Sequence, residues 1–236
     1  MTSPSGTATP KPEPGRADAD RTRLTKSAVV DQALQLADTV GLEALTIRKL
    51  ATELGVTPMA LYWHFRSKEE LLTGLVERVW AEIDLEVDRS APWPDQLRTL
   101  FESLLAVLRA HPAASKLLLE FNKQTEASLR PTELTLEILR GAGFDREHAA
   151  GIARYALWNG IMLASSAPGS EWLSLEDRVE GQRKKQITFA MLPPDDYPQL
   201  VECAVAMTSS EAPEFHYQLG VDLFIAGVEA IAAKRG

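Results

Sequence analysis

The chain contains 236 residues, of which 45% are hydrophobic, a length that suffices for one large or two modest globular domains. No run of about 18 apolar residues occurs, which excludes a membrane-spanning helix, and the N-terminus lacks the apolar core of a secretion signal. The one cysteine, Cys203, excludes an internal disulfide and a cysteine-rich zinc site, and we expect it to be buried as a small hydrophobic residue. These features indicate a cytoplasmic protein that makes no contact with a membrane.

The formal net charge of −8 at pH 7 argues at first against nucleic acid as a partner, because phosphate binding needs cations. The charges are unevenly distributed, however. Residues 21–80 hold eight Lys and Arg against seven Asp and Glu, so the acidic excess falls on residues 81–236. The N-terminal part can therefore bind DNA, while the acidic remainder discourages DNA from docking on the wrong face.

Helical periodicity and capping residues divide the N-terminal part into short elements. Gly41 and Gly55 can end helices in a left-handed conformation, whereas Thr46 and the pair Thr57-Pro58 can begin them. The expected helices cover residues 24–40, 47–54, 58–65 and 68–83. The tail over residues 1–22, rich in Pro, Ser, Thr and Gly, is expected to be disordered.

The remainder of the chain also shows helical rather than strand periodicity. Further helices are expected over residues 95–110, 113–126, 131–141, 145–165 and 214–234, and a helix of uncertain limits near 174–191 within the weakly patterned region 166–213. The fold class is therefore all-α. We expect a three-helix helix-turn-helix domain over residues 23–68 and a helical effector-binding and dimerisation domain over 69–236, connected by the helix 69–84.

Two short helices joined by a glycine-containing turn form the geometry that places the second short helix in the DNA major groove. Leu61 and Phe65, four residues apart, can pack inward. Pro58, Met59, Tyr62 and His64 then lie on the outer face, where apolar and aromatic side chains can meet thymine methyl groups, sugars and phosphates. Trp63 can belong either to the core or to the DNA contact. The alternative is a short helical hairpin that merely packs against the rest of the chain.

Residues 45–72 read LTIRKLATELGVTPMALYWHFRSKEELL, and this segment resembles the DNA-binding domain of the tetracycline-repressor family. The resemblance runs from about residue 24 to 83. It implies that Thr46 and Arg48 contact phosphate or the groove and that Lys68 contacts phosphate at a helix N-terminus. The residues expected to bind DNA are Thr46, Arg48, Thr57, Pro58, Met59, Tyr62, His64 and Lys68.

Residues 215–229 resemble the final helix of the tetracycline-repressor branch, which pairs with the helix at 145–165 to build a four-helix dimer interface. The helix 145–165 is apolar nearly all round, which a helix tolerates only when it is covered on every side. Glycine inside a helix costs about 1 kcal/mol relative to alanine, so the glycines of the last helix suggest close approach of a neighbouring helix. The expected interface residues are Gly220, Leu223, Phe224, Gly227 and Ile231.

The tetracycline-binding branch holds magnesium through a histidine, and this sequence departs from that pattern. The alignment puts Leu100, Leu104 and Leu118 at positions that are polar, aromatic and metal-binding in that branch. We therefore expect no metal, no other cofactor and no chelated drug. The residues expected to line an apolar effector cavity are Leu100, Leu104, Leu118, Phe121, Asn122, Leu136, Trp158 and Met162. The alternative is that these residues fill a solid core.

The sequence thus predicts a transcriptional regulator, and we expect a homodimeric repressor that binds a palindromic double-stranded DNA operator. A small, largely apolar ligand would release it without a metal. Two alternatives stay open: a regulator controlled by a protein partner or by no ligand, and a helical enzyme. The second has little support, because no glycine-rich phosphate loop and no nucleophile with a nearby base can be recognised. The ligand, the operator and the choice between repression and activation cannot be derived from the sequence.

Overall fold

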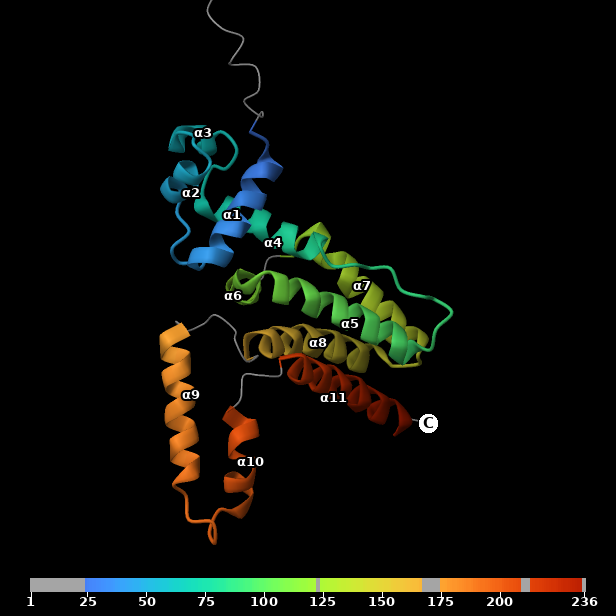
Figure 1. Cartoon of the computed structure of the whole chain (residues 1–236). Coiled ribbons are helices and arrows are strands. Elements are labelled where there is room, and N and C mark those ends of the chain that lie inside the picture. The colour runs from blue at the N-terminus through green and yellow to red at the C-terminus, as the bar shows by residue number, and fades with distance from the viewer. Residues whose placement is uncertain (1–23, 122–123, 167–174, 209–212, 235–236) are drawn as a thin grey trace, which may run out of the picture.

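The computed structural model describes residues 24–121, 124–166, 175–208 and 213–234. The predicted tail over residues 1–22 and the candidate cavity residue Asn122 lie outside this part of the chain. The described residues form helices and no strand, as the sequence predicts (Figure 1). The helices are α1 (Lys26–Val40), α2 (Ile47–Glu53), α3 (Pro58–Tyr62), α4 (Lys68–Ala81), α5 (Trp93–Ala110), α6 (Pro112–Glu120), α7 (Glu126–Gly141), α8 (Arg146–Ser166), α9 (Leu175–Ala190), α10 (Pro198–Thr208) and α11 (Pro213–Ala233).

Side-chain caps fix where the first four helices begin. The hydroxyl oxygens of Thr46 and Thr57 accept hydrogen bonds from the third backbone N–H beyond them, at 3.1 and 3.3 Å. Thr25 and Ser67 cap α1 and α4 in the same way. Gly55 has a φ of 65°, the left-handed conformation that allows the sharp turn between α2 and α3. The predicted helix-turn-helix is therefore present with nearly the expected boundaries.

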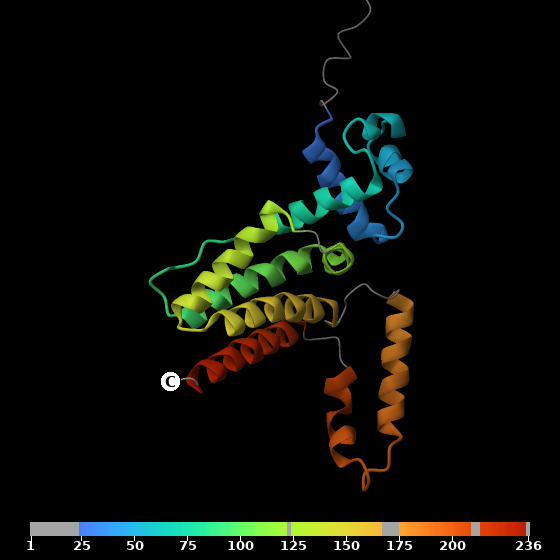
Figure 2. The same ribbon diagram turned by 180° about the vertical axis from the view of Figure 1, so that it is seen from behind.

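Helix α4 connects the N-terminal helices to the rest of the molecule. It packs against α1 on one side and against α6 and α7 on the other. Figure 2 shows α4 running from the α1–α3 group into the helical body, where α5 lies among α6, α7, α8 and α11. Any displacement of α4 relative to the body therefore moves the helix-turn-helix.

The largest differences from the expected limits are in α3, α6 and α7. Helix α3 ends at Tyr62 rather than at residue 65. Helix α7 begins at Glu126 rather than near residue 131, because Thr125 and Ser128 form a capping box ahead of Pro131. The described part of α6 ends at Glu120, short of the predicted 126. Helix α10 was not predicted, although its first residue, Pro198, is a common opening residue.

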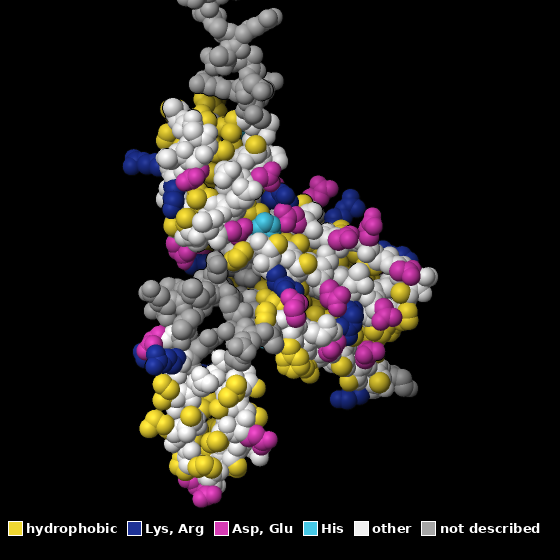
Figure 3. All heavy atoms as spheres, viewed as in Figure 1, with side chains coloured by type: hydrophobic (Ala, Val, Ile, Leu, Met, Phe, Trp, Pro, Cys, Tyr) yellow, Lys and Arg dark blue, Asp and Glu magenta, His cyan; other side chains and the backbone are white. Residues whose placement is uncertain are grey.

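Helices α9 and α10 pack against each other as a hairpin that projects from the body (Figures 1 and 2). Hydrophobic side chains gather on its surface (Figure 3). Cys203 lies in α10 and is exposed, so the expectation that it is buried is wrong. Among the described helices, α9 and α10 pack chiefly against each other, so few neighbours can cover an apolar residue of this hairpin. No helix in the described residues has the length and apolarity needed to cross a membrane.

Candidate nucleic-acid interface and ligand cavity

Helix α3 has one face in the core and one face in solvent. Leu61 and Phe65 are fully buried, as the spacing predicts. Met59, Tyr62 and Trp63 are 69%, 49% and 86% exposed, so the possibility that Trp63 belongs to the core is excluded. A group of large apolar and aromatic side chains in solvent is typical of a binding surface.

The remaining candidate DNA contacts lie around α3. Thr46 and Arg48 at the start of α2, Thr57 and Pro58 at the start of α3, and Lys68 at the start of α4 are all exposed, whereas His64 is half-buried. Basic side chains project from the edge of this domain (Figure 3). Helix N-termini beside exposed cations attract anions such as phosphate.

In the first turn of α4, the carboxylate of Glu70 is paired with other groups, whereas the ammonium group of Lys68 is not paired with any described residue. Glu70 accepts hydrogen bonds from the Arg66 backbone N–H at 2.8 Å and from Lys26 Nζ at 3.1 Å. These bonds lower the pKa of Glu70. Within the described residues Lys68 makes no ion pair, so its ammonium group is available to a phosphate.

A cavity of about 270 Å³ lies between α5, α7 and α8. Buried apolar side chains form its floor, and polar side chains, three of them exposed, lie at its edge. Trp80 and Ile83, at the end of α4, also line it. The residues that line it are Trp80, Ile83, Leu97, Leu100, Phe101, Leu104, Gln124, Pro131, Thr132, Thr135, Ala153, Arg154, Ala156 and Leu157.

The structure brings only part of the predicted set to this cavity. Leu100 and Leu104 line it. Leu118 is buried elsewhere in the core, and Phe121 and Leu136 are half-buried against that core. These three side chains do not line the cavity, because the packing of α6 and α7 directs them to other parts of the apolar interior.

Trp158 and Met162, expected in the cavity, do not line it either, because they lie on the exposed face of α8. They are 49% and 59% exposed, whereas their neighbours Leu157 and Ile161 are half-buried and buried. A rotation of about 100° per residue places each pair on different faces of α8. Because α8 is apolar nearly all round, its sequence could not indicate which face is internal. Trp80, Ile83 and Arg154 were missed, since nothing in the sequence brings the end of α4 to α8.

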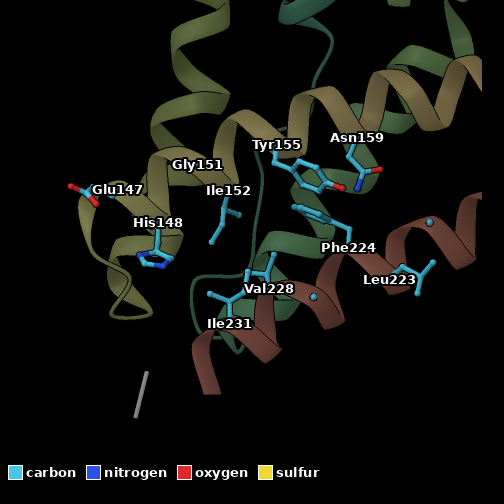
Figure 4. A pocket seen from close by; sticks show the side chains of 12 residues that line it. Glu147, His148, Gly151, Ile152, Tyr155, Asn159, Leu223, Phe224, Val228 and Ile231 are labelled. Carbon is cyan, nitrogen blue, oxygen red and sulfur yellow. The ribbon is translucent and has the colours of Figure 1, made fainter. Parts of the chain in front are cut away.

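An open groove of about 820 Å³ lies between helices α8 and α11 (Figure 4). Tyr155, Leu223 and Ile231 line it and are 62%, 65% and 37% exposed. Phe224 also lines it, although the side chain is buried against Phe101 with ring centroids 4.5 Å apart. Figure 4 shows these side chains facing the space between the two helices.

The two candidate interface glycines have different surroundings. A Cβ atom at Gly220 would lie 2.5 Å from the Leu163 side chain of the same chain, so this glycine permits α11 to approach its own α8. The close approach of a neighbouring helix that the sequence suggests is therefore present at Gly220, and this helix is α8 of the same chain. A Cβ atom at Gly227 would meet nothing within 4 Å. Gly227 thus has no packing requirement within the described residues of one chain.

His111 joins the helix-turn-helix to the helical body. It lies between α5 and α6, with Nδ1 2.7 Å from Asp38 of α1 and Nε2 2.8 Å from Glu82 at the end of α4. Asp38 also accepts from the Ala113 backbone N–H at 3.0 Å, and Arg78 pairs with Glu82. Only the protonated imidazole can donate to both carboxylates.

Burial lowers the pKa of His111, but the hydrogen bonds with Asp38 and Glu82 outweigh it and hold this pKa above the usual 6.5. A histidine whose folded-state pKa is raised stabilises the fold fully below pH 6.5, and this contribution is lost as the pH rises through the folded-state value. We expect His111→Gln to lower the free energy of unfolding by about 2 kcal/mol below pH 6.5 and by less at higher pH. Urea unfolding at several pH values measures this. A difference between wild type and variant that does not change with pH would contradict the account.

The chain has a helix-turn-helix with an exposed second helix, and α4 connects it to a helical body with a cavity. This architecture is that of a DNA-binding regulator whose DNA-binding and ligand-binding parts belong to one polypeptide. The sequence model "Bacterial regulatory proteins, tetR family" matches residues 29–75, and "Tetracyclin repressor-like, C-terminal domain" matches residues 88–232. The chain belongs to the tetracycline-repressor family of transcriptional regulators. Members of this family are DNA-binding transcription factors.

Relatives cover nearly the whole chain. An HTH-type transcriptional regulator of Saccharopolyspora erythraea is 28% identical over 98% of this chain and 99% of that protein. The class C tetracycline repressor protein of Escherichia coli is 29% identical over 88% and 91% of the two chains. The structure of the Streptomyces coelicolor TetR family protein ActR in complex with actinorhodin superimposes on this chain with a TM-score of 0.75 at 26% identity. The match covers 91% of this chain and 100% of ActR.

Proposed function

We propose that this regulator is a cytoplasmic repressor that binds a palindromic operator as a homodimer and is released by a small, largely apolar ligand without a metal. The DNA contacts are those of α2, α3 and the start of α4. Tyr62 and Trp63 support this assignment, because solvent is an unfavourable environment for such large aromatic surfaces. The exposed Arg48 and Lys68 would supply the salt-dependent contacts with phosphate.

The observation that carries the proposal for ligand control is the position of the cavity. Trp80 belongs to the last turn of α4 and Ile83 follows its end, and both line the same cavity as Leu100 and Leu104 of α5. A ligand that enlarges this cavity must displace the end of α4, whose other end begins directly after the helix-turn-helix. The ion pairs of His111 with Asp38 and Glu82 form a second connection across this junction. ActR, whose structure contains actinorhodin, is a relative that binds a small molecule.

The groove between α8 and α11 is the proposed dimer surface. It presents Tyr155, Leu223 and Ile231, all apolar or aromatic and all at least 37% exposed, while Trp158 and Met162 lie exposed on α8 outside the groove. A contiguous apolar surface of this kind is typical of a protein–protein interface. Two copies related by a twofold axis would cover it and would place two recognition helices on successive half-sites.

The test uses Ala153, which lines the cavity and is half-buried. Compounds that raise the melting temperature of the wild type are first selected from a panel of aromatic compounds, and operator affinity is then measured with each of them. We expect each stabilising compound to weaken operator binding, and Ala153→Phe to lose both effects because the phenyl ring fills the cavity. Operator affinity of ligand-free Ala153→Phe is the control, because a phenyl ring that displaced the end of α4 would weaken operator binding by itself. Compounds that stabilise the protein but leave operator affinity unaltered would refute ligand-controlled release.

A further inference from the structure

The cavity has one charged side chain among the described residues that line it, Arg154 of α8. The floor is formed by buried residues such as Leu97, Phe101 and Ala156, whereas Arg154 is exposed. The long apolar stem of an arginine can lie along the wall while its guanidinium group stays hydrated. The cavity therefore combines an apolar interior with a cation at its edge.

Arg154 makes no ion pair and no side-chain hydrogen bond within the part of the chain that the structure describes. The other polar side chains at the cavity differ from it in what they offer. Thr132 and Thr135 donate their hydroxyl protons to the carbonyl oxygens of Ser128 and Pro131, at 2.9 and 2.8 Å. Both threonines therefore present acceptor lone pairs to the cavity, and the donors at its edge are Arg154 and the Gln124 amide.

We propose that the effector is an apolar compound that carries one acidic group, and that Arg154 binds this group. The inference rests on the proposed function, since it specifies the ligand of that cavity. A guanidinium group holds a carboxylate or sulfonate with two parallel hydrogen bonds, which are stronger than bonds between neutral groups. Because the guanidinium group is exposed, the acid keeps part of its hydration and the cost of burying a charge is avoided. The apolar remainder of the ligand would occupy the space beside Leu100 and Phe101.

Two fluorescent dyes with one aromatic framework test this assignment. 8-Anilinonaphthalene-1-sulfonate carries an anionic group, and N-phenyl-1-naphthylamine is the same framework without it. We expect the wild type to bind the sulfonate about tenfold more tightly than the uncharged dye. Arg154→Met keeps an apolar stem and should lower the affinity for the sulfonate about tenfold while leaving the uncharged dye unaffected. Arg154→Lys should retain part of the preference.

Ala153→Phe locates the dyes and separates the two proposals. If it prevents binding of both dyes, but the wild type binds them equally or Arg154→Met changes neither affinity, the acid-binding inference is overturned and the cavity stands. If neither dye binds, or if binding survives Ala153→Phe, the cavity itself is not the ligand site and both proposals fail. Operator affinity of Arg154→Met should equal that of the wild type, which shows that the variant is folded.

Discussion

Tyr62→Ala is expected to weaken operator binding about a thousandfold while the melting temperature stays unchanged. Tyr62 is 49% exposed and lies on the outer face of α3, so its removal takes nothing from the core. Aromatic side chains at the centre of an interface contribute about 2 kcal/mol or more each, and a dimer would lose two of them. Titration of labelled operator DNA measures the affinity, and thermal unfolding measures the stability.

Tyr197→Ala is a matched control, because Tyr197 is 47% exposed but lies next to α10, at the far end of the molecule (Figure 1). It should leave operator affinity unchanged. A Tyr62→Ala variant that unfolds at a markedly lower temperature would assign Tyr62 to the core and contradict the orientation of α3.

Lys68→Ala should weaken binding to all DNA sequences alike and lower the salt slope, which is the change of log affinity with log salt concentration, by about one.

Gly227→Leu is expected to convert the protein into monomers that cannot hold a palindromic operator. A Cβ atom at Gly227 meets nothing within 4 Å, so one chain accommodates the leucine, whereas a second copy packed on the groove does not. Gly220 cannot serve for this experiment, because its substitution would collide with Leu163 of the same chain. Sedimentation velocity gives the mass, and operator titration gives the affinity, which we expect to fall at least about a hundredfold.

Gly141→Leu is the corresponding control. Gly141 also has nothing within 4 Å of a Cβ position, but it lies at the end of α7, outside the groove. Its variant should remain dimeric and should bind the operator normally. A Gly227→Leu protein that sediments as a dimer with full operator affinity would place the interface elsewhere.

Local signals account for what could be predicted of the fold. Thr46, Gly55 and the pair Thr57-Pro58 act within a few residues of themselves, so the sequence alone indicates where α2 begins and ends and where α3 begins. The expected helix over residues 131–141 begins too late, because the Thr125 capping box begins α7 at Glu126. Capping boxes built from Thr and Ser are weaker sequence signals than a proline.

At the candidate sites, features that depend on neighbouring residues could be predicted, whereas features that depend on how distant helices pack could not. The exposed face of α3 follows from the burial of Leu61 within the helix and of Phe65 just after it. The cavity depends on how α4, α5, α7 and α8 meet, and Trp158 and Met162 were assigned to it because a helix that is apolar on every side gives no orientation. The contact of Gly220 with Leu163 likewise joins residues far apart in the chain. Helical periodicity within one segment cannot reveal such contacts.

The exposed face of α3 is expected to read a twofold-symmetric operator. Selection of the full chain against random double-stranded DNA, followed by footprinting of the enriched sequences, tests it most directly. The account predicts an enriched palindrome, protection on both half-sites about one helical turn apart or a multiple of it, and loss of that protection with Tyr62→Ala. Enrichment of an asymmetric sequence, or no enrichment above non-specific binding, would contradict it.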